Sequence, residues 1–180
     1  FFPVIIETSN LNSYNYSILS EIMNKNNVGV RLEINMIKKG YFQEFSSGEK
    51  LFSKINYINI PFLLHYYLLD NKQSVYINLG PYLEYLLKVN SQNIPSSINA
   101  SEVYFFDEKT DNKLGYGLKL SIGLSTLMKM NKIQLDFSYM YNFSNLISPD
   151  YKSDLAPDVS NFNTLSISLV YLFNFTKNEI

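Results

Sequence analysis

Apolar and polar residues alternate along most of this chain. In the segment Leu114–Met128, every second residue is apolar, and the positions between carry mainly Gly, Ser and Lys. A helix would group apolar residues three and four positions apart, whereas a period of two places them on one face of a β-strand. The segment therefore predicts one long strand. Its glycines, Gly115, Gly117 and Gly123, do not fit a phosphate-binding loop, which needs a strand before it and a helix after it; we expect them to make room for larger neighbours.

The same test predicts seven further strands, which makes eight. Five are clear and two are weaker: the clear ones are Val28–Met36, Asn56–Leu68, Val75–Val89, Ile133–Phe143 and Thr164–Phe175, and the weaker ones are Phe1–Thr8 and Tyr14–Ile22. The connections differ in length. Short polar links are expected at Met23–Asn27, Asp70–Gln73 and Lys129–Lys132, and long ones at Lys39–Lys54, Asn90–Lys113 and Asn145–Asn161.

Two architectures share this pattern: a soluble barrel or sandwich with its apolar face inside, and a membrane barrel with its apolar face outside. Strands of about 5 to 6 residues are usual in soluble sheets, while a tilted membrane-spanning strand needs about 9 to 11. The predicted strands are mostly of nine to fifteen residues. Their length favours the membrane barrel.

Aromatic residues give a further indication. They gather at the ends of two predicted strands: Tyr139, Tyr141 and Phe143 in one, and Tyr171, Phe173 and Phe175 in the other. Aromatic girdles at the two membrane interfaces are typical of outer-membrane barrels. We therefore predict an all-β fold, an eight-stranded antiparallel up-and-down transmembrane β-barrel with short periplasmic turns and longer extracellular loops. We expect a single domain over residues 1–180, with a first strand truncated at Phe1.

Composition narrows the function classes. The 180 residues carry a formal net charge of −1 and no basic tract, which argues against a nucleic-acid partner. The chain has no Cys and one His, so thiolate chemistry, disulfides and His-rich metal sites are excluded, and we expect no cofactor. No apolar run approaches the ~20 residues that a membrane helix needs. A helical membrane protein is therefore excluded, whereas a β-barrel is not.

Charged residues occur on the face that the barrel model turns toward the lumen. The predicted lumen set is Arg31, Glu33, His65, Glu84, Lys88, Lys119 and Asp136. Such groups could line an ion path, but in a barrel of eight strands, whose interior is about filled by side chains, they more often neutralise one another. His65 could also be the base of an acyl-transfer site, yet no sequence feature places a Ser beside it. We interpret the set as structural.

Several segments resemble a known family. They are "YINIPFLLHYYL" (57–68), "YINLGPYLEYLL" (76–87), "LGYGLKLSIGL" (114–124), "LDFSYMYNFSNL" (135–146) and "LSISLVYLFNF" (165–175), with "RLEIN" (31–35) before them. In this order they are similar to the PorT-like outer-membrane β-barrel family of Bacteroidetes. The most specific parts are Ile60-Pro61 and Gly80-Pro81-Tyr82. The resemblance implies an eight-stranded outer-membrane barrel, in a family of which some members serve type IX secretion and gliding, and it implies no catalytic residues.

Three functions follow as hypotheses. The first is a non-enzymatic barrel in the outer membrane, a structural or accessory subunit whose partners are outer-membrane lipid and other outer-membrane or periplasmic proteins of a complex. The second is an outer-membrane enzyme acting on lipid or peptide through His65. The third is a soluble barrel that binds an apolar ligand, which would reverse the two faces.

Overall fold

In a computed structural model, the described residues form seven antiparallel β-strands. The structure describes residues 12–24, 26–44, 50–68, 72–92, 112–128, 131–145 and 163–173. The strands are β1 (Tyr16–Met23), β2 (Val28–Glu44), β3 (Lys50–Tyr67), β4 (Gln73–Gln92), β5 (Leu114–Met128), β6 (Asn131–Asn142) and β7 (Thr164–Leu172). Within these ranges, no helix is long and apolar enough to cross a membrane.

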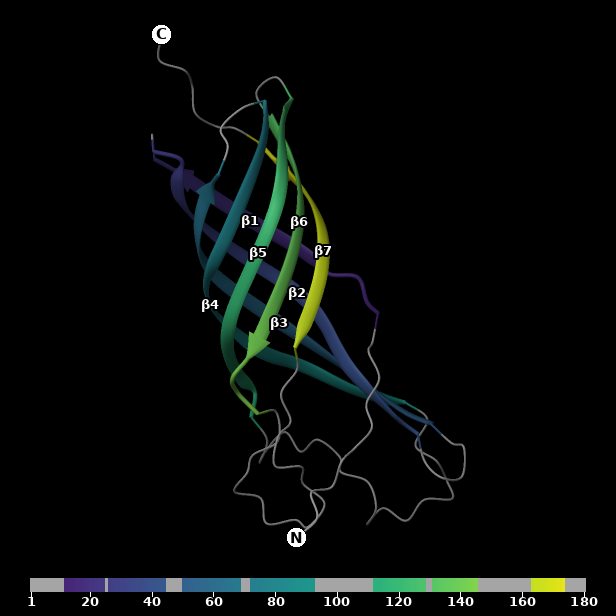
Figure 1. Ribbon diagram of the computed structural model, residues 1–180. Coiled ribbons are helices and arrows are strands. Elements are labelled where there is room, and N and C mark those ends of the chain that lie inside the picture. The colour runs from purple at the N-terminus through teal and green to yellow at the C-terminus, as the bar shows by residue number, and fades with distance from the viewer. Residues whose placement is uncertain are drawn as a thin grey trace.

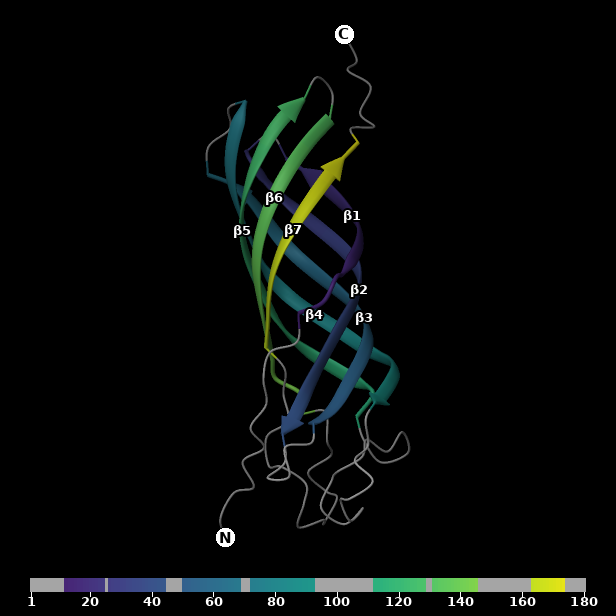
Figure 2. The same ribbon diagram turned by 90° about the vertical axis from the view of Figure 1, so that its right-hand side faces the viewer.

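Each strand pairs with its neighbours in the chain, so the sheet has the order β1 to β7 without a crossover. Figures 1 and 2 show the sheet curled into part of a barrel, with β2 and β3 crossing obliquely behind β5 and β6 in Figure 1. This arrangement confirms the predicted all-β, antiparallel up-and-down topology. The predicted strand Phe1–Thr8 lies outside the described residues, so the count of eight stays a prediction.

The two ends of the sheet differ. At the turn end, β1–β2, β3–β4 and β5–β6 are joined by links of a few residues, and the first of these turns contains Asn27 at a φ of 61°, a backbone conformation that Asn tolerates better than most residues. At the loop end, 113 minus 92 leaves 21 residues between β4 and β5, and 163 minus 142 leaves 21 between β6 and β7. These two ends are called the turn end and the loop end below.

The prediction of a long loop at Lys39–Lys54 is wrong for most of that segment. Pairing between β2 and β3 continues to Glu44 opposite Lys50, so that only residues 45–49 separate the strands. The sequence pattern ends at Met36 because apolar and polar residues alternate only where the outer face of the strand is apolar. Main-chain pairing does not require such a face, and it continues where the outer face becomes polar.

Side chains sort between two faces as the alternation predicts. Along β5 the outward residues Leu118, Leu120, Ile122 and Leu124 are 43 to 55% exposed, and the intervening residues are buried. The glycines of β5 face inward, where a Cβ on Gly123 would collide with the ring of Tyr76 and one on Gly117 with the ring of Tyr82. They therefore leave room for two lumen tyrosines.

Apolar residues cover the outside of all seven strands. The outward run on β5 extends from Leu114 to Leu124, ten residue steps, which at about 3.3 Å per residue and a tilt of about 40° spans roughly 25 Å along the barrel axis. That is the height of the apolar band in outer-membrane barrels. The exposed rings of Tyr141 and Phe143 lie at the loop end and those of Tyr171 and Phe173 at the turn end, as expected for two girdles; Phe175 lies outside the described residues.

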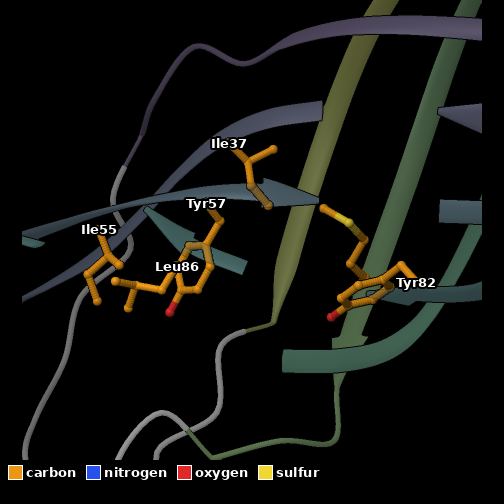
Figure 3. Packing of buried hydrophobic residues seen from close by; sticks show 6 residues of the cluster. Ile37, Ile55, Tyr57, Tyr82 and Leu86 are labelled. Atoms are coloured by element: carbon orange, nitrogen blue, oxygen red, sulfur yellow. The ribbon is translucent and has the colours of Figure 1, made fainter. Parts of the chain in front are cut away.

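A small apolar cluster fills the lumen toward the loop end. It consists of Ile37, Ile55, Tyr57, Tyr82, Leu86 and Met140, with Val89 packed against it, and its members come from β2, β3, β4 and β6 (Figure 3). The cluster lies beside the polar groups described next, and together they occupy the interior.

The two edge strands of the described sheet are β1 and β7. Among the residues that the structure describes, β1 pairs with β2 and β7 with β6. A groove of about 710 Å³ separates these two strands, lined on one side by Ser17 and Leu19 and on the other by Ser166, Ser168 and Val170. Because of this groove, the described residues of β1 and β7 do not close the barrel by pairing with each other.

Candidate functional site: the polar lumen

The structure buries six of the seven predicted lumen residues inside the curled sheet. They are Arg31, Glu33, His65, Glu84, Lys119 and Asp136, each at most 7% exposed. They occupy three levels between the turn end and the loop end. The seventh residue, Lys88, lies elsewhere.

Arg31 is the centre of the level nearest the turn end. Its guanidinium lies 3.2 Å from Glu21 and 3.3 Å from Asp136, and it also donates to the amide oxygen of Gln134. Glu33 approaches to 3.9 Å. A cation that is 1% exposed thus has carboxylates from three strands around it, which offsets the cost of taking it out of water.

Asp136 is shared by several donors besides Arg31. Its Oδ2 accepts hydrogen bonds from Tyr76 Oη at 3.0 Å, Ser121 Oγ at 3.2 Å and Asn78 Nδ2 at 3.4 Å. These donors come from β4 and β5, whereas Asp136 belongs to β6. The carboxylate therefore ties three neighbouring strands together from inside.

His65 is fully buried beside this level. Its Nδ1 lies 2.5 Å from Asn78 Oδ1 and its Nε2 lies 3.6 Å from Glu21 Oε1, while the rings of Tyr67 and Tyr76 pack at 4.6 and 4.9 Å. Among the described residues, none of its hydrogen bonds involves a serine. The geometry is that of a packed polar side chain.

The middle level is one ion pair with amide support. Lys119 Nζ on β5 lies 2.6 Å from Glu33 Oε2 on β2, across the lumen. Asn35 Nδ2 donates to the same carboxylate at 3.1 Å and to Asn59 Oδ1 at 3.2 Å. The pair joins strands that are not neighbours in the sheet and so braces the curled shape.

The level nearest the loop end is a second ion pair. Lys39 Nζ lies 2.7 and 3.0 Å from the two oxygens of Glu84, and Asn142 Nδ2 donates to Glu84 at 2.7 Å. The ammonium of Lys39 also lies 5.1 Å from the centre of the Tyr57 ring, within the range of a cation–π contact.

Sequence reasoning missed three charged members of this network, Lys39, Glu21 and Lys132, of which the first two lie deepest. Lys39 shares the parity of Arg31 and Glu33, but we assigned it to a loop because the apolar alternation ended at Met36. Glu21 lies in the weak strand Tyr14–Ile22, whose inward face it shares with Leu19. Extending the alternation of inward and outward positions through both segments would have identified Lys39 and Glu21.

Among the side chains that the structure describes, the charges of the lumen balance. Four carboxylates, those of Glu21, Glu33, Glu84 and Asp136, face four cations, those of Arg31, Lys39, Lys119 and the half-buried Lys132, whose ammonium lies 4.6 Å from the ring centre of Tyr67. Ion-selective pores carry rings of one charge sign instead. Within the part of the chain that the structure describes, no group of three or more metal-ligating side chains could hold a metal ion.

The lumen position predicted for Lys88 is wrong, and a β-bulge is the reason. Asn56 pairs with Lys88, but the next residue, Tyr57, pairs with Leu86, so Leu87 has no residue opposite it. The extra residue reverses the alternation beyond it. Val89 consequently faces inward and packs beside the cluster that includes Leu86, and Lys88 is exposed on the outer face.

An up-and-down sheet with an apolar outer face and a polar, packed interior defines the protein as a transmembrane β-barrel. A family model described as "Outer membrane protein beta-barrel domain" matches residues 6–148, and the chain belongs to that family. Its location is therefore the outer membrane. Searches of curated proteins and of solved structures gave no match.

Proposed function

We propose that the protein is a non-enzymatic barrel that acts through its surfaces, as a structural or accessory subunit of a larger envelope complex. The observation that carries this proposal is the charge-balanced lumen, which is filled by side chains bonded to one another. Such an interior stabilises a wall and offers no wide path for a solute. The protein would therefore act through its outer surface and its loops.

We propose that this complex is a secretion or gliding machinery of the type IX kind. The support for this choice is the resemblance of segments such as Gly80-Pro81-Tyr82 to the PorT-like proteins of Bacteroidetes. Membership of an outer-membrane barrel family agrees with it at a coarser level.

We further infer that the barrel has eight strands and that Phe1–Thr8 is the missing one. The described chain begins at Asn12, which itself lines the groove between β1 and β7. β1 starts at the loop end, so a strand before it would run from the turn end and lie antiparallel to both edges. The family match begins at residue 6, ahead of β1, which indicates that the barrel domain includes part of this segment.

The alternative of a soluble barrel is not supported, because the apolar faces point outward. An enzyme centred on His65 is disfavoured by the burial of the imidazole and by its contact with Asn78, which occupies Nδ1.

The test is isolation of the tagged chain from its own outer membrane in mild detergent, followed by size-exclusion chromatography and quantitative mass spectrometry. We expect defined envelope proteins at a constant ratio to the barrel. The variant His65→Gln keeps a side chain that can bond to Asn78, and it should give the same complex and the same heat-modifiable migration on gels. A monomeric barrel whose hydrolysis of lipid or peptide disappears in His65→Gln would contradict the proposal.

A further inference from the structure

Three strands extend beyond the rest of the sheet at the loop end. Pairing of β1 with β2 stops at Tyr16 opposite Met36, and pairing of β4 with β5 stops at Tyr85 opposite Leu114. Pairing among β2, β3 and β4 continues for several residues further, to Gln92 on β4. Figure 1 shows these strands projecting past the others. We call residues 37–44, 50–58 and 86–92 the three-stranded extension.

The outer face of this extension carries three lysines close together. Lys38, Asn56 and Lys88 lie directly opposite one another on β2, β3 and β4, and Lys54 lies two residues from Asn56 on β3. All three lysines are exposed. Lys54 is the diagonal neighbour of both Lys38 and Lys88, at about 7 to 8 Å, and Lys38 and Lys88 lie two strands apart, at about 10 Å. Their long side chains can therefore bring the three ammonium groups around one anion.

These lysines make no ion pair with a carboxylate among the described residues. Glu44, the acidic residue of β2 beyond Lys38, lies six positions further along the strand. Like charges on adjacent strands repel, and the repulsion is relieved when an anion binds between them. This differs from the lumen, where every cation described above has an anionic or aromatic partner.

The position of the three lysines relative to the membrane indicates which anion they bind. On the turn-end side of the cluster, the outward residues Met36, Ile58 and Tyr85 lie opposite one another and belong to the apolar band. The lysines therefore lie just outside the hydrocarbon region, at the level of lipid headgroups. Because short turns face the periplasm in outer-membrane barrels, the loop end faces the outer leaflet.

We propose that Lys38, Lys54 and Lys88 form a binding site for the phosphate groups of an outer-leaflet glycolipid. Lysine binds phosphate as a compact, flexible point charge, and three such charges on a flat strand surface can share one phosphorylated headgroup. The bulge at Leu87 has a role in this site, because without it Lys88 would point into the lumen. The apolar outer residues below the cluster would contact the acyl chains.

The experiment uses the folded full chain in a non-ionic detergent and bis-phosphorylated lipid A as the probe, with binding measured by native mass spectrometry and microscale thermophoresis. At roughly fivefold per lysine near an anionic surface, the triple variant Lys38→Gln, Lys54→Gln, Lys88→Gln should bind about a hundredfold more weakly. Lys88→Gln alone should lose about fivefold. Lys72→Gln is the matched control, because Lys72 is exposed at the turn end, and it should bind like the wild type.

Two comparisons make the outcome decisive. Dephosphorylated lipid A and phosphatidylglycerol should both bind at least tenfold more weakly than the bis-phosphorylated probe. Equal binding of the triple variant and the wild type would overturn the site, and equal binding of dephosphorylated lipid A or phosphatidylglycerol would overturn its assignment to glycolipid phosphate. Unchanged heat-modifiable migration of each variant shows that folding is not the cause.

Discussion

Several buried ion pairs in the lumen join strands that are not neighbours in the sheet. The clearest case is Lys119 with Glu33, at 2.6 Å and with both side chains less than a tenth exposed. Removal of one partner leaves a buried charge without compensation, whereas removal of both charges together can be nearly neutral. The pair is thus a direct probe of whether the lumen is packed or wet.

We predict that Lys119→Met lowers the free energy of unfolding by about 3 to 5 kcal/mol, the usual cost of breaking a buried pair. The double variant Lys119→Met, Glu33→Gln should recover most of that loss. Reversible urea unfolding in lipid vesicles, followed by tyrosine fluorescence, measures both. A single variant as stable as the wild type would mean that Glu33 is solvated and the lumen open.

At the scale of a strand, the alternation on β5 separates a lipid face from a lumen face. Leu120 lies in the middle of the outward run and Leu114 at its loop-end limit, and both are at least half exposed. Lipid tails would cover both residues, but only Leu120 would lie at the depth of the bilayer midplane.

We predict that Leu120→Arg destabilises the inserted barrel by roughly 2 to 4 kcal/mol and that Leu114→Arg costs only about 0 to 1 kcal/mol, because the penalty for a charge depends on its depth. The comparison of the two variants by urea unfolding in the same vesicles controls for the chemistry of the substitution. Equal costs at the two positions would contradict the assignment of the outer face to lipid.

The sequence pattern predicted the positions of most strands, but it was less accurate for the positions of single side chains. Alternation placed Arg31, Glu84 and Asp136 on the inner face because an apolar outer face enforces a period of two. It misplaced Lys88 because one bulged residue, Leu87, reverses parity without any mark in composition. It missed Lys39 because the strand continues beyond the apolar band, where pairing persists and the outer pattern does not.

At the scale of the whole molecule, closure of the barrel depends on the segment that pairs with β1 and β7. An unpaired strand edge is costly inside a bilayer, because no water replaces the missing hydrogen bonds. Ile18 on β1 and Ile167 on β7 are 80 and 70% exposed, on the outer face of these two edges. The groove between the edges is the place where Phe1–Thr8 is proposed to pair.

The chain contains no cysteine, so introduced cysteines report contacts without background. We predict that single cysteines scanned through residues 2–7 form disulfides with Ile18→Cys and, at neighbouring scan positions, with Ile167→Cys, because paired strands bring Cα atoms within about 4.4 to 6.8 Å. Pairs between residues 2–7 and Leu120→Cys, on a distant strand, are the control. A scan in which no position links to either edge would contradict closure by this segment.

The central claim is that a filled, charge-balanced lumen leaves the protein to act through its surfaces. Its most direct test is the electrical conductance of planar bilayers that contain the full chain, after insertion has been established in the same lipid by protease protection and heat-modifiable migration. We predict that inserted protein gives no stepwise conductance, and that the variant Lys119→Gly, Glu33→Gly, which removes both charged side chains of the middle level, conducts more than the wild type. Regular unitary conductance of the wild type would contradict the claim.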